Sequence, residues 1–153
     1  MLQAVPKGWF SSKYIVSEND TPIGMIDMSG WRESAELTIK GAIYQVYRQG
    51  LMTGSFVLDA GGSILARADK PSAFYRSFVV EVGGKKYSLE ATSTFSCKFV
   101  LSEEGKQIGS VHREGFLARK AIADFPDEIQ LPFRMFMFWL VMILWRRSDS
   151  AAS

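Results

Sequence analysis

The sequence contains few residues that could carry out chemistry. It has a single histidine, His112, and a single cysteine, Cys97. Together they cannot form a typical structural zinc site, and one cysteine cannot form an intramolecular disulfide. The sequence also lacks a glycine-rich phosphate loop ending in Lys-Ser/Thr and a Gly-x-Ser-x-Gly elbow. We therefore expect no catalytic residue, metal or cofactor, and we interpret His112 as a structural or exposed residue of a strand.

Carboxylates gather at two places. Glu103 and Glu104 lie in a polar turn, where charged side chains are ordinary solvated surface. Asp124, Asp127 and Glu128 precede an apolar C-terminal segment. Because acids complement the positive end of a helix dipole, we expect this second group to cap a helix. An acid–base pair would need one carboxylate in an apolar setting, which the pattern does not indicate.

Basic residues form two groups that could bind an anion. The first group is Lys70, Arg76, Lys85 and Lys86, and the second is Arg113, Arg119 and Lys120. Near an anionic lipid surface, each would contribute roughly 1 kcal/mol. The alternative is that the lysines of the first group discourage strand-edge pairing. The net charge is only +2, with basic residues scattered between acids, so we expect no nucleic-acid-binding face.

The segments that position these residues repeat three times. Tyr14–Ile26 reads YIVSENDTPIGMI, Phe56–Ala68 reads FVLDAGGSILARA, and Phe99–Val111 reads FVLSEEGKQIGSV. Each copy predicts a β-hairpin with a four-residue polar loop, in which Asp20, Gly62 or Gly105 takes the left-handed conformation. The copies begin 42 and 43 residues apart.

Further strands are expected after each hairpin, because these segments are rich in β-branched and aromatic residues. About four strands per unit gives roughly 10 to 12 strands, which must curl, split or close. We therefore predict a mainly β fold: a closed antiparallel barrel of about 12 strands, built from three repeats of about 43 residues.

The C-terminal segment LPFRMFMFWLVMILWRR breaks this pattern. Its residues from Met135 to Trp145 are apolar on every side, which predicts a helix that is enclosed by protein. The uncharged run of 11 residues would be about 16 Å long, half of a bilayer core. We expect the helix, about residues 132–147, to thread the barrel, with Arg134 at the entrance and Arg146 and Arg147 at the exit. The alternative is a tail-anchored membrane protein that inserts this segment.

Repeated hairpins around an apolar C-terminal helix resemble the tubby C-terminal-like superfamily, which includes the LURP-one-related proteins and the phospholipid scramblases. The resemblance covers about Tyr14 to Arg147 and is closest to small single-domain members of bacterial type. It implies binding of an anionic phospholipid or phosphoinositide. The scramblase signatures of clustered cysteines and an acidic calcium loop are missing.

These patterns predict one domain over residues 1–153, with its core at about 14–147 and a frayed tail from Ser148. We expect a cytoplasmic, non-enzymatic monomer that associates peripherally with a membrane. It would bind anionic lipid through Lys70, Arg76, Lys85, Lys86, Arg113, Arg119 and Lys120, or bind a protein partner, and it would not bind nucleic acid.

Overall fold

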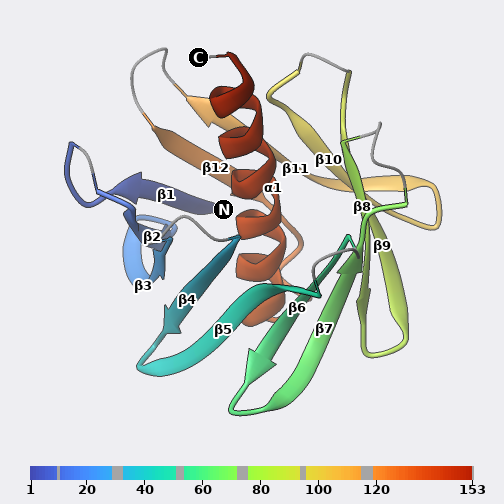
Figure 1. Cartoon of the computed structure of the whole chain (residues 1–153), viewed down its shortest axis with the longest axis horizontal. Coiled ribbons are helices and arrows are strands. Elements are labelled where there is room, and N and C mark those ends of the chain that lie inside the picture. Colours follow the sequence, from blue (N-terminus) through green and yellow to red (C-terminus); the bar gives the residue numbers. More distant parts are fainter. Residues whose placement is uncertain are drawn as a thin grey trace.

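The protein forms a closed antiparallel barrel around one helix (Figure 1). The computed structural model describes residues 1–9, 11–28, 33–50, 54–71, 76–93, 96–114 and 119–152. The strands are β1 (Leu2–Pro6), β2 (Lys13–Glu18), β3 (Thr21–Asp27), β4 (Ser34–Ile39), β5 (Ala42–Gln49), β6 (Ser55–Ala60), β7 (Ser63–Asp69), β8 (Ser77–Val82), β9 (Lys85–Ala91), β10 (Phe99–Glu103), β11 (Lys106–Glu114) and β12 (Lys120–Asp124). They pair in chain order, and β1 closes the ring against β12. The predicted barrel of about 12 strands is confirmed.

The threefold repeat has a structural counterpart in the sheet. Each of the hairpins β2–β3, β6–β7 and β10–β11 shifts register at the same place, between Val16 and Ser17, Leu58 and Asp59, and Leu101 and Ser102. These positions are separated by the same 42 and 43 residues as the hairpin sequences. A β-bulge increases local twist and bends a strand, so three equivalent bulges help the sheet to curl into a barrel.

The N-terminal strand completes the third unit. Leu37 pairs with Tyr44 and Val80 pairs with Tyr87 within the first two units. At the equivalent place in the third unit, Ala123 pairs with Leu2 of β1. The predicted core began at about residue 14, but the barrel begins at Leu2. The hairpin repeat did not reveal β1, because the strand pair that completes the third unit is β12 with β1, from opposite ends of the chain.

The hairpin turns are tighter than the sequence suggested. Each has two residues between its strands, not a four-residue loop, and both residues have positive φ. In the first hairpin these are Asn19 (48°) and Asp20 (69°), and in the third Glu104 (50°) and Gly105 (78°). Two consecutive left-handed residues match the twist of antiparallel strands, which explains why Gly, Asn and Asp recur there.

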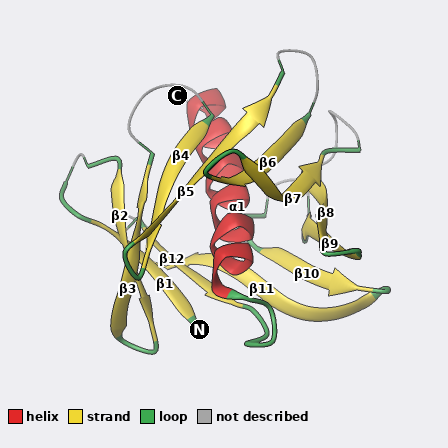
Figure 2. Cartoon of the chain, turned by 90° about the horizontal axis from the view of Figure 1, so that it is seen from below, coloured by secondary structure: helices red, strands yellow, loops and turns green. Residues whose placement is uncertain are grey.

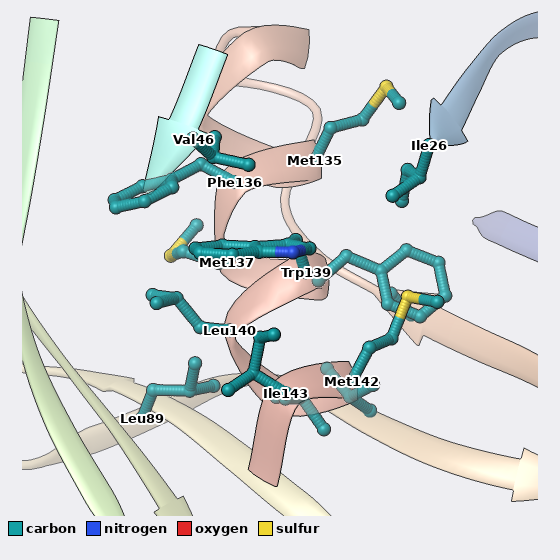
Figure 3. Close-up of a cluster of buried hydrophobic side chains, with 14 of the residues drawn as sticks. Ile26, Val46, Leu89, Met135, Phe136, Met137, Trp139, Leu140, Met142 and Ile143 are labelled. Atoms are coloured by element: carbon teal, nitrogen blue, oxygen red, sulfur yellow. The ribbon is translucent and has the colours of Figure 1, made fainter. Parts of the chain in front are cut away.

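The helix α1 (Leu131–Ala152) runs through the barrel, as Figure 2 shows from a second direction. Every residue from Met135 to Trp145 is buried, with exposures of 0 to 6%. In Figure 3, Trp139 lies at the centre of a cluster in which Val46 and Leu89 of the strands face the helix. The ring of Trp139 meets that of Phe56 edge-on at 5.7 Å. The predicted enclosed helix is confirmed.

The helix extends beyond its predicted end at residue 147. Its last turn continues to Ala152, so Arg146 and Arg147 do not lie in the last turn. The tail from Ser148 was predicted to be frayed, but Asp149 accepts two hydrogen bonds from the Arg113 guanidinium, at 3.0 and 3.2 Å. This contact, made with a residue 36 positions away, stabilises helical structure that local sequence does not favour.

The two ends of the barrel differ in their connections. At the hairpin end, where α1 begins, the strands are joined by the tight turns, and Arg134 binds Glu18 and the Ile129 carbonyl. At the exit end, where α1 emerges, Trp145 donates to the Cys97 carbonyl at 2.9 Å. No helix among the described residues is long and apolar enough to span a membrane.

Candidate binding surface at the exit end of the barrel

Basic and acidic side chains are distributed unevenly between the two ends of the barrel. Each end of the barrel consists of its connections, the two outermost residues of each strand and the adjoining part of α1. The exit end has eleven basic residues in the described chain: Lys7, Lys13, Arg48, Lys70, Arg76, Lys98, Arg113, Arg119, Lys120, Arg146 and Arg147. It has six acidic residues: Asp27, Glu33, Asp69, Glu90, Glu114 and Asp149.

The hairpin end has the opposite balance. Its five described basic residues are Lys40, Lys85, Lys86, Lys106 and Arg134. Its nine acidic residues are Glu18, Asp20, Asp59, Glu81, Glu103, Glu104, Asp124, Asp127 and Glu128. Among the described side chains, the exit end thus has an excess of five positive charges and the hairpin end an excess of four negative charges. The small net charge of +2 conceals a strong axial dipole.

The structure separates the predicted basic residues. Five of the seven lie at the exit end: Lys70, Arg76, Arg113, Arg119 and Lys120. Lys85 and Lys86 begin β9 at the hairpin end, although the sequence grouped them with Lys70 and Arg76. The six residues of β8 intervene, a length of about 20 Å. One small ligand could not contact both sets.

The two lysines of β9 have local surroundings at the hairpin end. The Nζ atom of Lys85 lies 3.9 Å from Glu103, whose carboxylate was predicted to be solvated. Lys86 borders a cavity of about 360 Å³ on the outer wall, with Ser88 and Ser102 among its lining residues. Neither lysine contributes to the positive surface at the exit end.

Four described arginines at the exit end pack on aromatic rings, and three of them, Arg76, Arg119 and Arg147, do so at equivalent places in the repeat. The Arg76 guanidinium lies 5.2 Å from the ring centre of Phe99, and that of Arg119 lies 5.2 Å from Tyr14. Arg76 and Arg119 are equivalent positions, 43 residues apart, and each covers the first aromatic residue of the next unit. Such cation–π contacts attract the guanidinium to the face of the ring.

The third unit-to-unit contact is made differently. Glu33 occupies the position equivalent to Arg76, and it binds the Arg147 side chain of α1. The guanidinium of Arg147 then lies 5.9 Å from the ring of Phe56, the third equivalent aromatic residue. The helix thus supplies the arginine that the first unit lacks, and the contact also fixes the helix in the barrel.

Electrostatics at this contact reflects the crowding of positive charge. Burial acts to raise the pKa of Glu33, but its hydrogen bond with Arg147 and the charges of Arg147, Arg48 and Arg146 outweigh burial and lower it. Burial, followed by repulsion from Arg147, lowers the pKa of Lys70. A dense positive surface favours approach of an anion, because an anion relieves repulsion of this kind.

The remaining exit-end candidates are held in ion pairs. Arg113 stacks on Trp145, 4.7 Å from its ring centre, while it binds Asp149. The Nζ atom of Lys120 lies 3.3 Å from Glu114. These residues therefore stabilise the exit end of the barrel and also contribute to its positive charge.

The barrel does not bring together the residues that could take part in catalysis or bind a metal. His112 lies on β11, where it pairs with Ile122 of β12, and Cys97 is exposed. Asp127 lies 3.8 Å from the guanidinium of Arg134. The predicted capping of the helix by carboxylates is not observed, because the first turn of α1 has no acidic residue and the amides of Phe133 and Arg134 donate to the Gln130 carbonyl. Within the described ranges, no group of three or more His, Cys, Asp and Glu side chains could hold a metal ion.

The sequence interpretation missed other residues of this surface. Lys7 and Lys13 border the β1–β2 connection, and Lys98 lies far along the chain in the β9–β10 connection, so only closure of the barrel brings them to one end. Trp9, between two of them, is 87% exposed. A tryptophan flanked by lysines was the available signal, but it lay outside the recognised repeat.

Comparison with known proteins did not extend this description. Neither the scan against protein-family models nor the searches of curated proteins and solved structures found a significant match. The resemblance to the tubby C-terminal-like superfamily therefore stays a prediction.

Proposed function

We propose that this protein is a non-catalytic barrel that attaches to an anionic phospholipid surface, with its exit end facing the lipid. The observation that carries the proposal is the separation of charge along the barrel axis. A positive end attracts anionic headgroups, and the opposite sign at the other end orients the molecule as it approaches.

Screening favours this orientation over the reverse. At physiological ionic strength, charges interact over about 8 Å. Basic residues at the exit end would contribute roughly 1 kcal/mol each when they lie near the surface. Acids at the hairpin end, about 20 Å away, would then be largely screened. Attachment would be reversible and would weaken as salt is added, and the expected phospholipid binding of tubby-like proteins agrees with it.

Two double variants with equal net charge test the proposal. Lys7→Gln with Lys98→Gln removes two exposed charges from the exit end, and Lys86→Gln with Lys106→Gln removes two from the hairpin end. Binding is measured by co-sedimentation with vesicles of phosphatidylcholine containing about 30% phosphatidylserine. At roughly 1 kcal/mol per charge, the exit-end variant should bind about 30-fold more weakly. The hairpin-end variant should bind like the wild type.

Three results would contradict the proposal. The first is a folded wild-type protein that does not sediment with these vesicles. The second is equal binding to vesicles of pure phosphatidylcholine, because the attraction would then not be electrostatic. The third is equal weakening by both double variants, which would show that net charge alone matters. Capture by an acidic protein, without vesicle binding, would favour a protein partner instead.

A further inference from the structure

Trp9 lies in the connection between β1 and β2, in which the structure describes residues 7–9, 11 and 12. The amide of Lys7 donates to the Lys13 carbonyl at 2.8 Å, and the amide of Ser11 donates to the Gly8 carbonyl at 3.2 Å. The Lys13 amide donates to the Ser11 hydroxyl at 3.0 Å. Backbone groups on both sides of Trp9 are therefore hydrogen-bonded within this connection.

Arg119 fixes this turn from the neighbouring part of the barrel. Its guanidinium donates to the carbonyls of Ser11, at 3.1 Å, and of Trp9, at 3.5 Å. The same guanidinium donates to the Tyr14 hydroxyl at 2.6 Å while it covers the Tyr14 ring. The turn is thus attached to the wall of the barrel through its backbone.

The side chain of Trp9 is exposed despite this ordered backbone. It is 87% exposed, whereas Trp139 and Trp145 are 0% and 5% exposed. A tryptophan ring is large and mostly apolar, with one polar N–H, so it is favoured at a boundary between water and a less polar phase. In membrane proteins, tryptophan is enriched at the level of the lipid headgroups for this reason.

We propose that Trp9 is an interfacial anchor whose indole inserts among the headgroups of an anionic phospholipid bilayer, with Lys7 and Lys13 beside the phosphates. This inference rests on the proposed function, because it assumes that the exit end faces lipid. Charge complementarity favours lipid as the occupant: the two lysines lie on either side of Trp9 in the sequence, and the exit end as a whole is positive. The attachment then has a short-range apolar component that salt does not screen.

The first experiment compares Trp9→Ala with Ile43→Ala. Ile43 is 57% exposed near the hairpin end, so it is a matched apolar control that faces away from the lipid. With the phosphatidylserine vesicles described above, Trp9→Ala should weaken binding about tenfold, and Ile43→Ala should not change it. Thermal unfolding should be unchanged in both variants, because both side chains are exposed.

The second experiment measures contact directly. Vesicles that contain lipids brominated near the headgroup should quench the tryptophan fluorescence of the bound wild type. The measurement is made in a Trp31→Phe background, because this fourth tryptophan lies outside the described residues. When Trp9→Phe is added, at saturating lipid, the quenching should be largely lost, because Trp139 and Trp145 are buried.

The outcomes separate the two proposals. If the wild type binds but Trp9→Ala binds equally well, the anchor is refuted and electrostatic attachment stands. The anchor is also refuted if quenching persists when Trp9→Phe is added to Trp31→Phe, or if the bound Trp31→Phe protein is not quenched, which would favour a protein partner. If the wild type does not bind vesicles, both proposals fail.

Discussion

Removal of α1 is expected to unfold the barrel. In the chain that ends at Gln130, the strands remain but the helix does not. Eleven consecutive helix residues, Met135 to Trp145, are buried inside the ring of strands. The strand residues that face them would lose their cover as well, so the interior would either fill with water or collapse.

The magnitude follows from burial of these side chains. Burying one large apolar side chain contributes about 1.5–3 kcal/mol, so the eleven contribute roughly 15–30 kcal/mol before losses. Residual burial in the unfolded chain lowers this by about 10–40%. A domain of this size has a net stability of about 5–15 kcal/mol. The free energy of burial that is lost with the helix is therefore as large as the net stability of the whole fold, or larger.

The assay is unfolding by heat and by urea, monitored with near-ultraviolet circular dichroism. The shortened chain should be insoluble, or should show no cooperative transition. Because a truncated chain can fail for other reasons, Trp139→Ala is the milder companion and should lower stability by about 3–5 kcal/mol. A soluble shortened chain with a cooperative transition would refute the reasoning. It would show that the barrel closes without the helix, and the tail-anchor alternative would then be favoured.

Two further predictions concern the barrel wall and its ion pairs. A Cβ at Gly24 would lie 2.0 Å from the Thr38 carbonyl oxygen, so Gly24→Ala should lower the free energy of unfolding in urea by about 1–3 kcal/mol. The control is Gly8→Ala, whose Cβ would meet only Ser11 at 4.0 Å and should cost almost nothing. Equal effects of the two substitutions would contradict the close approach at Gly24. The pKa of Glu33 is lowered in the fold, so its ion pair stabilises the fold above the ordinary carboxyl pKa of about 4.3 and that contribution is lost as the pH falls through the lower folded value. Glu33→Gln should accordingly be less stable than the wild type at pH 7, with the difference shrinking below about pH 4; a difference that did not shrink would show that the contact is not ionic.

Much of the architecture could be predicted from local patterns. The hairpin repeat predicted equivalent units, and the apolar segment without a polar face predicted an enclosed helix. These inferences succeeded because side-chain burial and turn conformation depend on residues close together in the chain. The fourth strand of the third unit was missed because β1 pairs with β12 across most of the chain length.

The candidate surface was less predictable. Lys85 and Lys86 are near Lys70 and Arg76 in sequence, but an intervening strand carries them to the other end of the barrel. Conversely, Glu33 binds Arg147, although 114 residues separate them. Sequence spacing therefore gave misleading neighbours for long-range electrostatics.

The sequence by itself determined the repeated hairpins, the approximate number of strands and the need to enclose the helix, because these follow from local conformation and from the exclusion of apolar side chains from water. Only the tertiary structure decided where the charges lie. Antiparallel strands carry successive connections to opposite ends of the barrel, so closure of the ring collects basic residues from distant segments at one end and acidic residues at the other. A net charge of +2 gave no sign of that separation.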